Sequence, residues 1–267
     1  MLNHRAIITL SILGVLTTVN CHSLDTRGRE SDDDDDGDQS TSSENPQVLI
    51  ISLDGFRHDF TDDPSNPLPN LQRLYKEGVK AKWMTASYAT KTFPNHHSIN
   101  TGLYEESHGI VANKMFDPDW SESFDHCSSP ACAKWYQGTA LWNVNEILMP
   151  YKRAKRHGDS HQRSMPAPPR RSGVIYWPGI GSGMNGRQPT HCDPFVNEDR
   201  MTLQERMDKM LNWFTNDTMP INFGMLYFEE PDATCHRHGP ESAEVKAKLK
   251  DIDNDFGKYT RSVNAKY

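Results

Sequence analysis

The feature that most constrains the fold is a continuous, largely apolar run, Val48–Leu53, which ends at Asp54-Gly55. A run of β-branched residues and leucine without polar alternation is typical of a strand buried on both faces, and such strands occur in parallel sheets that helices cover. A second apolar segment, Ile221–Phe228, is likewise followed by acidic residues. The sequence therefore predicts a central sheet with parallel strands.

Helical patterns lie between these strands. Residues Pro69–Gly78 carry leucines at helical spacing and end in glycine, and Thr202–Phe214 is amphipathic, so both predict helices. Val79–Thr85 is predicted as a further strand. Strand, helix and strand in this order favour an α/β fold, with a central, mostly parallel sheet flanked by helices.

The N-terminal residues 1–21 are predicted to be a signal peptide, because a weakly basic start precedes the apolar run Ala6–Val19. As a helix this run would reach about 21 Å, which is short of the roughly 30 Å hydrocarbon core, so a membrane anchor is the less favoured alternative. No later segment is long and apolar enough to span a bilayer. We therefore expect a secreted, extracellular protein.

Residues 22–46 are predicted to be a disordered acidic leader, because they carry almost no large apolar residue. Six aspartates there (32–36 and 38) account for most of the net charge of −7, so the remainder is nearly neutral and does not indicate a nucleic-acid partner. Residues 151–171 hold seven Lys or Arg and three Pro, which predicts a basic surface insertion. A protease-processing site at Arg153–Arg156 is the alternative.

Four cysteines lie beyond the predicted signal peptide: Cys127, Cys132, Cys192 and Cys235. Three disulfide pairings are open to them, and Cys127 with Cys132 would close a short loop. A zinc knuckle is less favoured because no second close pair of thiols completes a ligand set. The sequence Asn-Asp-Thr at 216–218 predicts glycosylation of Asn216.

Acidic residues follow both predicted buried strands, at the edge where open α/β sheets place their functional loops. Asp54 follows the first strand and Asp232 the second, with His236 four residues later. Carboxylate and imidazole are zinc ligands, and this spacing brings Asp232 and His236 together on one turn of helix. A structural ion pair is the alternative for these two residues.

A polar turn, Thr90–Ser98, contains hydroxyl groups and is followed by a helix-like run to Gly102. A hydroxyl at the N-terminus of a helix lies in a field that favours anions, which makes Thr92 a candidate nucleophile. The alternative is that Thr92 serves as an N-cap.

Four segments occur in the order found in a known family: Leu53–Arg57, Thr90–His96, His108–Asn113 and Glu229–His236. Through them the chain resembles the ectonucleotide pyrophosphatase/phosphodiesterases of the alkaline phosphatase superfamily. The sequence of residues Thr101–Gly109 is most similar to that of the type 4 and type 5 members. The resemblance covers about residues 48–257 and implies an alkaline phosphatase-like fold for a partial catalytic domain, residues 47–267.

The resemblance implies an extracellular phosphodiesterase that uses two zinc ions. Thr92 would attack phosphorus in nucleotide polyphosphates such as diadenosine triphosphate or ATP and form a covalent nucleotidyl-enzyme. Asp54 and Thr92 would hold one zinc, and Asp232 and His236 the other. Asn113 would donate to a phosphate oxygen in the transition state.

Two aromatic residues receive roles from the same resemblance. Phe93, beside the nucleophile, would stack on the nucleobase, and Tyr176 would line the same pocket. For both side chains, packing in the core is the alternative. Whether the substrate is a nucleotide or a lipid head group is left open.

The chain also departs from the family pattern. Cys235 stands where the family usually has glycine, the residues after Gly257 show no likeness, and the family's Asp-His-Gly motif and final histidine are absent from these 267 residues. Asp125-His126 is not expected to replace that motif. Each zinc is then left with two protein ligands, so we expect weak metal binding and an inactive chain. The alternative is a secreted, non-catalytic splice product that binds nucleotide or protein.

Overall fold

The computed structural model describes residues 7–12, 15–19, 47–147, 169–195 and 200–266. The strands are β1 (Ile7–Ile12), β2 (Val15–Val19), β3 (Val48–Leu53), β4 (Lys114–Asp117), β5 (Glu122–Asp125), β6 (Ser172–Ile175), β7 (His191–Asp193) and β8 (Phe223–Phe228). The helices are α1 (Pro69–Glu77), α2 (Thr92–Thr101), α3 (Glu105–His108), α4 (Leu141–Ile147), α5 (Leu203–Phe214), α6 (Asp232–His238) and α7 (Ala243–Lys266). The predicted leader, 22–46, and most of the predicted basic insertion lie outside the described residues.

The central sheet has the strand order β2-β1-β3-β8-β6-β7. Strands β1, β3, β8, β6 and β7 run parallel to one another, and β2 pairs antiparallel with β1 at one edge. The predicted parallel sheet is thus confirmed. In the β3–β8 pair Val48 lies opposite Phe223 and Leu53 opposite Phe228, so both strands end at the same level of the sheet. This register brings their acidic loops together.

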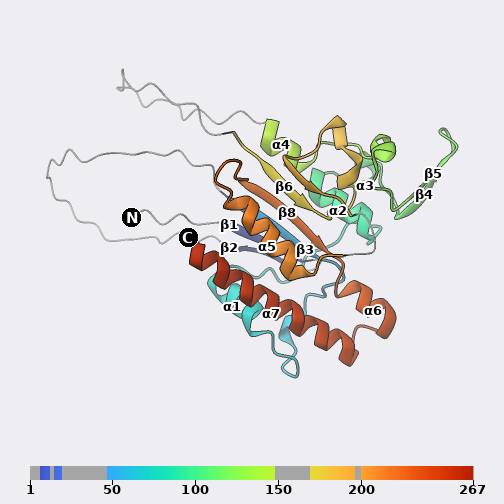
Figure 1. Cartoon of the computed structure of the whole chain (residues 1–267). Helices are drawn as coiled ribbons and strands as arrows, with labels where there is room; N and C mark the ends of the chain where they lie inside the picture. Colours follow the sequence, from blue (N-terminus) through green and yellow to red (C-terminus); the bar gives the residue numbers. More distant parts are fainter. Residues whose placement is uncertain (1–6, 13–14, 20–46, 148–168, 196–199, 267) are drawn as a thin grey trace, which may run out of the picture.

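Helices cover both faces of the sheet (Figure 1). Helices α5, α7 and α1 pack on one face, and α2 and α4 lie on the other, while the β4–β5 hairpin projects from the body. Gly224 of β8 illustrates the packing, because a Cβ there would lie 2.7 Å from the Met210 sulfur of α5. The sheet centre is fully buried, as Ile51 and Leu53 show. The predicted fold class is therefore correct.

Two predicted helices occur almost as expected. Helix α1 begins at Pro69, and the backbone N–H of Gly78 closes it by donating to the Leu74 carbonyl. Helix α5 begins after Thr202, whose side chain forms a reciprocal capping box with Glu205. These ends follow from local chemistry that the sequence already displays.

The predicted strand at Val79–Thr85 is wrong. This segment has no regular secondary structure, and Val79 and Trp83 are 65% and 53% exposed. Its alternating pattern resembles a strand, but a strand requires a hydrogen-bonding neighbour, and the described sheet provides none at this place. Lys80 instead forms an ion pair with Asp62.

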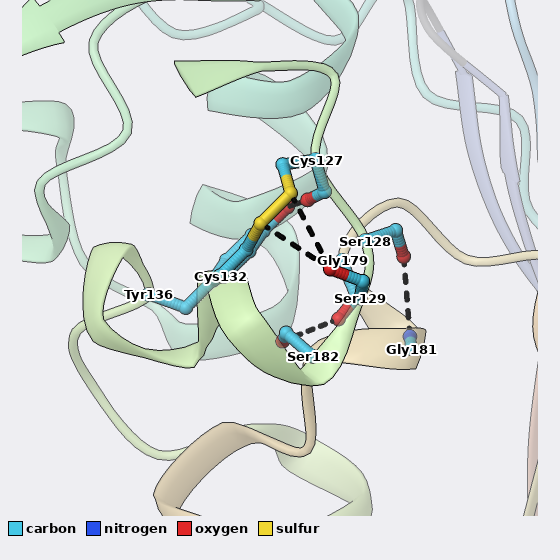
Figure 2. Close-up of a disulfide and its surroundings, with 8 residues drawn as sticks. All are labelled: Cys127, Ser128, Ser129, Cys132, Tyr136, Gly179, Gly181 and Ser182. Carbon is cyan, nitrogen blue, oxygen red and sulfur yellow. Dashed lines mark hydrogen bonds between the residues drawn. A yellow bond between two sulfur atoms is a disulfide. The ribbon is translucent and has the colours of Figure 1, made fainter. Parts of the chain in front are cut away.

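A disulfide joins Cys127 to Cys132, which is the short-loop pairing among those the sequence left open (Figure 2). The Ser129 hydroxyl lies 3.7 and 3.6 Å from the two sulfurs. Gly181 donates its N–H to the Ser128 hydroxyl at 3.1 Å, so the disulfide loop is held against the segment that follows β6. Cys192 and Cys235 are free thiols.

The predicted signal peptide overlaps β1 and β2, which form the outer part of the sheet beside β3. Removal of residues 1–21 stays a prediction about processing. None of the helices in the described part of the chain combines the length and the apolar composition that a membrane crossing requires.

Candidate active site

Asp54 lies at the carboxyl end of β3, where its backbone N–H donates to the Phe228 carbonyl of β8 at 2.9 Å. Its carboxylate accepts two hydroxyl hydrogen bonds on one oxygen, Oδ2. Thr92 Oγ1 donates from 3.0 Å and the Tyr227 hydroxyl from 2.8 Å. The structure thus places the candidate nucleophile directly against the candidate metal ligand.

Thr92 is the first residue of α2, and its side chain makes no capping hydrogen bond, since the N-cap position is Lys91. The N-cap alternative is therefore wrong for this threonine. His96 holds the helix start in place: its Nδ1 lies 2.7 Å from the Thr92 carbonyl oxygen and its Nε2 lies 2.9 Å from the Ser52 hydroxyl of β3. Complete burial lowers the pKa of His96, so the ring stays neutral.

Asn113 reaches the same place from the loop before β4. Its side-chain oxygen accepts from the Phe93 backbone N–H at 2.9 Å, which leaves the amide NH₂ free of this contact and available as a donor. Phe93 packs edge-on against Phe124 and His126, at 5.8 and 5.4 Å between ring centroids. Asn113 is thereby fixed one residue from the nucleophile.

Asp232 and His236 lie on α6, with His236 Nε2 3.3 Å from Asp232 Oδ2. The His236 side chain is 79% exposed. Asp232 joins this pair to the first half of the site, because its backbone N–H donates to the Asp54 carbonyl at 3.0 Å. The predicted residues therefore form two adjacent half-sites, Asp54 with Thr92 and Asp232 with His236.

The electrostatics of these half-sites favour a cation. Burial and the neighbouring Asp54 carboxylate raise the pKa of Asp232. Two carboxylates that repel each other in this way are stabilised by a positive charge between them. Their oxygens, with imidazole nitrogen, are ligands that suit zinc.

Comparison with known proteins places this geometry in a family. The family model described as type I phosphodiesterase / nucleotide pyrophosphatase matches residues 48–266. The chain belongs to this family. The match runs past Gly257, so the prediction that the following residues lack likeness is wrong; they continue α7, which extends to Lys266.

Relatives of the phosphodiesterase family include the bis(5'-adenosyl)-triphosphatase enpp4 of Xenopus laevis, 35% identical over 218 residues. The alignment covers 81% of this chain and 43% of that protein. The human ectonucleotide pyrophosphatase/phosphodiesterase family member 5 is 36% identical over 220 residues, which are 82% of this chain and 41% of the relative. The chain thus spans less than half of these relatives' length.

Solved phosphodiesterase structures agree with the fold. An inactive threonine-to-alanine variant of murine ectonucleotide pyrophosphatase/phosphodiesterase 5, in complex with AMP, is similar with a TM-score of 0.66 and 32% identity. The similarity covers 82% of this chain and 53% of the murine chain.

The candidate site has fewer ligands than a complete zinc centre requires. Among the described residues, no three or more His, Cys, Asp or Glu side chains converge on a point that could hold a metal ion. The donor types therefore fit zinc, whereas each half-site offers two ligands. Asp125 and His126 are not expected to replace the family's Asp-His-Gly motif. Their side chains hydrogen-bond to each other, and the His126 ring packs on Phe93.

Tyr176, predicted by resemblance to line the nucleotide pocket, is buried. Its ring contacts Phe195, at 5.4 Å between ring centroids, and the Arg206 guanidinium, 4.4 Å from its ring centre. These contacts favour the core-packing alternative, and a role for Tyr176 in nucleotide binding stays a prediction.

Sequence reasoning missed two residues that organise the candidate site, Tyr227 and Arg206. Arg206 is completely buried, and it donates to the Tyr227 carbonyl at 2.7 Å and to the Glu229 carboxylate at 2.8 Å. It thereby fixes the end of β8 just before Asp232. The available signal was a charged residue on the apolar face of α5, since Arg206 shares the helical spacing of Leu203 and Met210.

Proposed function

We propose that this site belongs to an extracellular nucleotide pyrophosphatase/phosphodiesterase, in which Thr92 attacks phosphorus to cleave phosphodiester or phosphoanhydride bonds. The observation that carries the proposal is the hydrogen bond from Thr92 Oγ1 to Asp54 at the N-terminus of α2. A hydroxyl in this position combines an adjacent carboxylate with a helix terminus that favours the charge of a phosphate. The resulting nucleotidyl-threonine would be cleaved by water.

The surrounding residues have defined tasks in this proposal. Asn113, held by the Phe93 N–H, directs its amide toward the negative charge that develops on a phosphate oxygen. Asp54 orients the threonine hydroxyl. Zinc, when bound by Asp54 with Thr92 and by Asp232 with His236, supplies Lewis acidity that lowers the pKa of the hydroxyl.

The proposed substrates are nucleotide polyphosphates such as diadenosine triphosphate or ATP. The name of the Xenopus laevis relative, a bis(5'-adenosyl)-triphosphatase, supports the first of these. The AMP complex of the inactive murine variant supports both a nucleotide ligand and a threonine that matters for activity. Phe93, partly buried beside Thr92, is the proposed stacking partner of the base.

A second candidate function is binding of nucleotide or protein without catalysis by a secreted product. The small number of zinc ligands favours this second function, because each half-site within the described residues offers only two. Catalytic zinc sites use three protein ligands, so we expect the 267-residue chain alone to bind zinc weakly and to hydrolyse nothing.

Export is part of the proposal, with residues 1–21 removed and Asn216 glycosylated. Asn216 is exposed just after α5, and its side-chain oxygen accepts from the Thr218 hydroxyl at 3.0 Å. Accessibility of this kind is what an acceptor asparagine requires.

The experiment uses a nitrophenyl nucleotide ester and two proteins. One is the 267-residue chain, and the other is a chimera in which residues 47–266 replace the matching part of the human family member 5. We expect zinc-dependent hydrolysis by the chimera and none by the chain alone.

Matched variants of the chimera assign the roles. Thr92→Ala should abolish hydrolysis, whereas Thr101→Ala, at the other end of α2, should leave it within about twofold. A chimera that folds, takes up zinc and yet hydrolyses at the same rate with Thr92→Ala would contradict the nucleophile. Hydrolysis by the chain alone that a chelator stops would contradict the expected inactivity.

A further inference from the structure

We propose that Tyr227 is a positioning residue for the metal-binding carboxylate: its hydroxyl holds Asp54 so that one defined oxygen, Oδ1, is presented to the cation. This inference rests on the proposed function, because it assigns a task within the proposed metal site. It concerns a residue on β8 that lies outside the four motifs of the sequence.

The hydrogen bonds at Asp54 distinguish its two oxygens. Oδ2 accepts from Tyr227 at 2.8 Å and from Thr92 at 3.0 Å, whereas Oδ1 accepts from the Gly55 N–H at 3.1 Å. A carboxylate oxygen offers two lone pairs, so Oδ2 is saturated and Oδ1 keeps one free position. A cation approaching this carboxylate therefore meets Oδ1.

The Tyr227 hydroxyl also maintains this orientation during the proposed reaction. When the Thr92 hydroxyl gives up its proton to solvent water, its hydrogen bond to Oδ2 is lost. Tyr227 continues to donate to the same oxygen, so the carboxylate does not rotate at the moment when the threonine oxygen attacks. Together with the Gly55 N–H on Oδ1, this donor from a buried side chain of β8 opposes rotation, because rotation of the carboxylate requires breaking both hydrogen bonds.

The tyrosine is itself held from two directions. Its side chain is buried, with the ring edge-on to His96 at 5.0 Å between centroids, and its carbonyl accepts from Arg206 at 2.7 Å. His96 forms a hydrogen bond with the Thr92 carbonyl. The Tyr227 ring, which positions Asp54, therefore packs on the histidine that positions Thr92. Loss of the hydroxyl alone would leave this packing intact.

The test compares Tyr227→Phe with Tyr136→Phe. Tyr136 is a matched control, because it is also buried, packs edge-on against a histidine of α2 (His97, at 5.1 Å), and donates its hydroxyl to a carbonyl, that of Cys127. Zn²⁺ binding is measured by isothermal titration on the chimera described above, because the 267-residue chain alone is expected to bind zinc weakly, and Asp54→Asn defines the binding that belongs to this site.

We expect Tyr227→Phe to weaken site-specific zinc binding by about 10- to 100-fold, the usual effect of removing a partner of a metal ligand, and Tyr136→Phe to change it less than about twofold. Wild-type affinity in Tyr227→Phe would overturn the inference, and so would equal weakening in Tyr136→Phe. Equal zinc uptake by wild type and Asp54→Asn would instead remove the proposed metal site, and the inference with it.

A metal-free measurement keeps the inference testable if zinc binding is weak. Urea midpoints are determined for wild type, Tyr227→Phe, Asp54→Asn and the double variant. A hydrogen bond between the two side chains predicts that the two midpoint shifts are not additive. Additive shifts would overturn the inference.

Discussion

Gly55 and Asp232 lie so close together that a Cβ built on Gly55 would be 2.7 Å from both Cα and Cβ of Asp232. Gly55 also has a φ of +65°, a conformation that side chains other than glycine rarely adopt. The close approach accompanies the hydrogen bond from the Asp232 N–H to the Asp54 carbonyl. This contact is what brings the two half-sites together.

Gly55→Ala should therefore disrupt the site. Gly102→Ala is the matched control, because Gly102 has a similar φ of +72° but no atom within 4 Å of a built Cβ. We expect the control to lose about 1 kcal/mol from backbone strain alone and Gly55→Ala to lose at least about 2 kcal/mol, since a clash is added. Urea denaturation measures both, and equal losses would contradict the close contact.

Asp232→Asn should separate metal binding from stability. Because the pKa of Asp232 is raised, its ionised form is the less stable one in the folded chain, and the penalty is present above the folded pKa. Removing the charge should leave the metal-free melting temperature unchanged or higher at pH 7 while zinc uptake falls. A lower melting temperature together with unchanged zinc uptake would assign Asp232 a structural role.

Arg206→Met should destabilise the chain by about 3 kcal/mol, the lower end for a broken buried pair, because Glu229 would lose its buried partner and keep only the half-exposed Arg200 at 3.7 Å. Arg237→Met is the control: Arg237 pairs with the neighbouring Glu230 at 3.4 Å, but its side chain is 60% exposed. An exposed pair of this kind contributes at most about 1 kcal/mol. Chemical denaturation compares the two variants, and equal effects would contradict the importance of burial.

Acid should destabilise the folded chain through His97. This histidine is buried on α2 beside His108, and burial lowers its pKa from 6.5 to about 4. Between pH 6.5 and about 4, His97 is therefore protonated in the unfolded chain but not in the folded chain. The free energy of unfolding falls as the pH drops through this range. The expected loss from this group is about 3 kcal/mol.

Unfolding free energies at pH 7, 5 and 4 test this prediction. His97→Gln removes the titrating group and should reduce the slope without abolishing it, because burial lowers the pKa of His96 and His108 as well. An identical slope in wild type and His97→Gln would show that other groups cause the acid sensitivity.

Much of the fold could be predicted because its signals are local. The largely apolar runs specify buried strands, Pro69 and Gly78 delimit α1, and the Thr202 capping box begins α5. Val79–Thr85 shows the limit of such signals: a strand forms only when a second strand lies beside it, and the residues of this segment do not specify that neighbour.

The candidate site divides in the same way. The sequence predicted Asp54, Thr92 and Asp232 as site residues, because they follow predicted strand ends or begin a predicted helix. Tyr227 could not be assigned from its position, since an aromatic residue within an apolar strand is ordinarily part of the core. Its task depends on the direction in which its hydroxyl points.

The sequence by itself determined the fold class, the family and the residue types available for chemistry, because apolar periodicity and ordered motifs lie along the chain. Tertiary structure alone decided the shared hydrogen bonds at Asp54, the close approach of Gly55 to Asp232 and the buried Arg206 pair. The physical reason is distance along the chain. Contacts between β3, α2 and β8 depend on strand register and helix packing, which arise only when the whole sheet assembles.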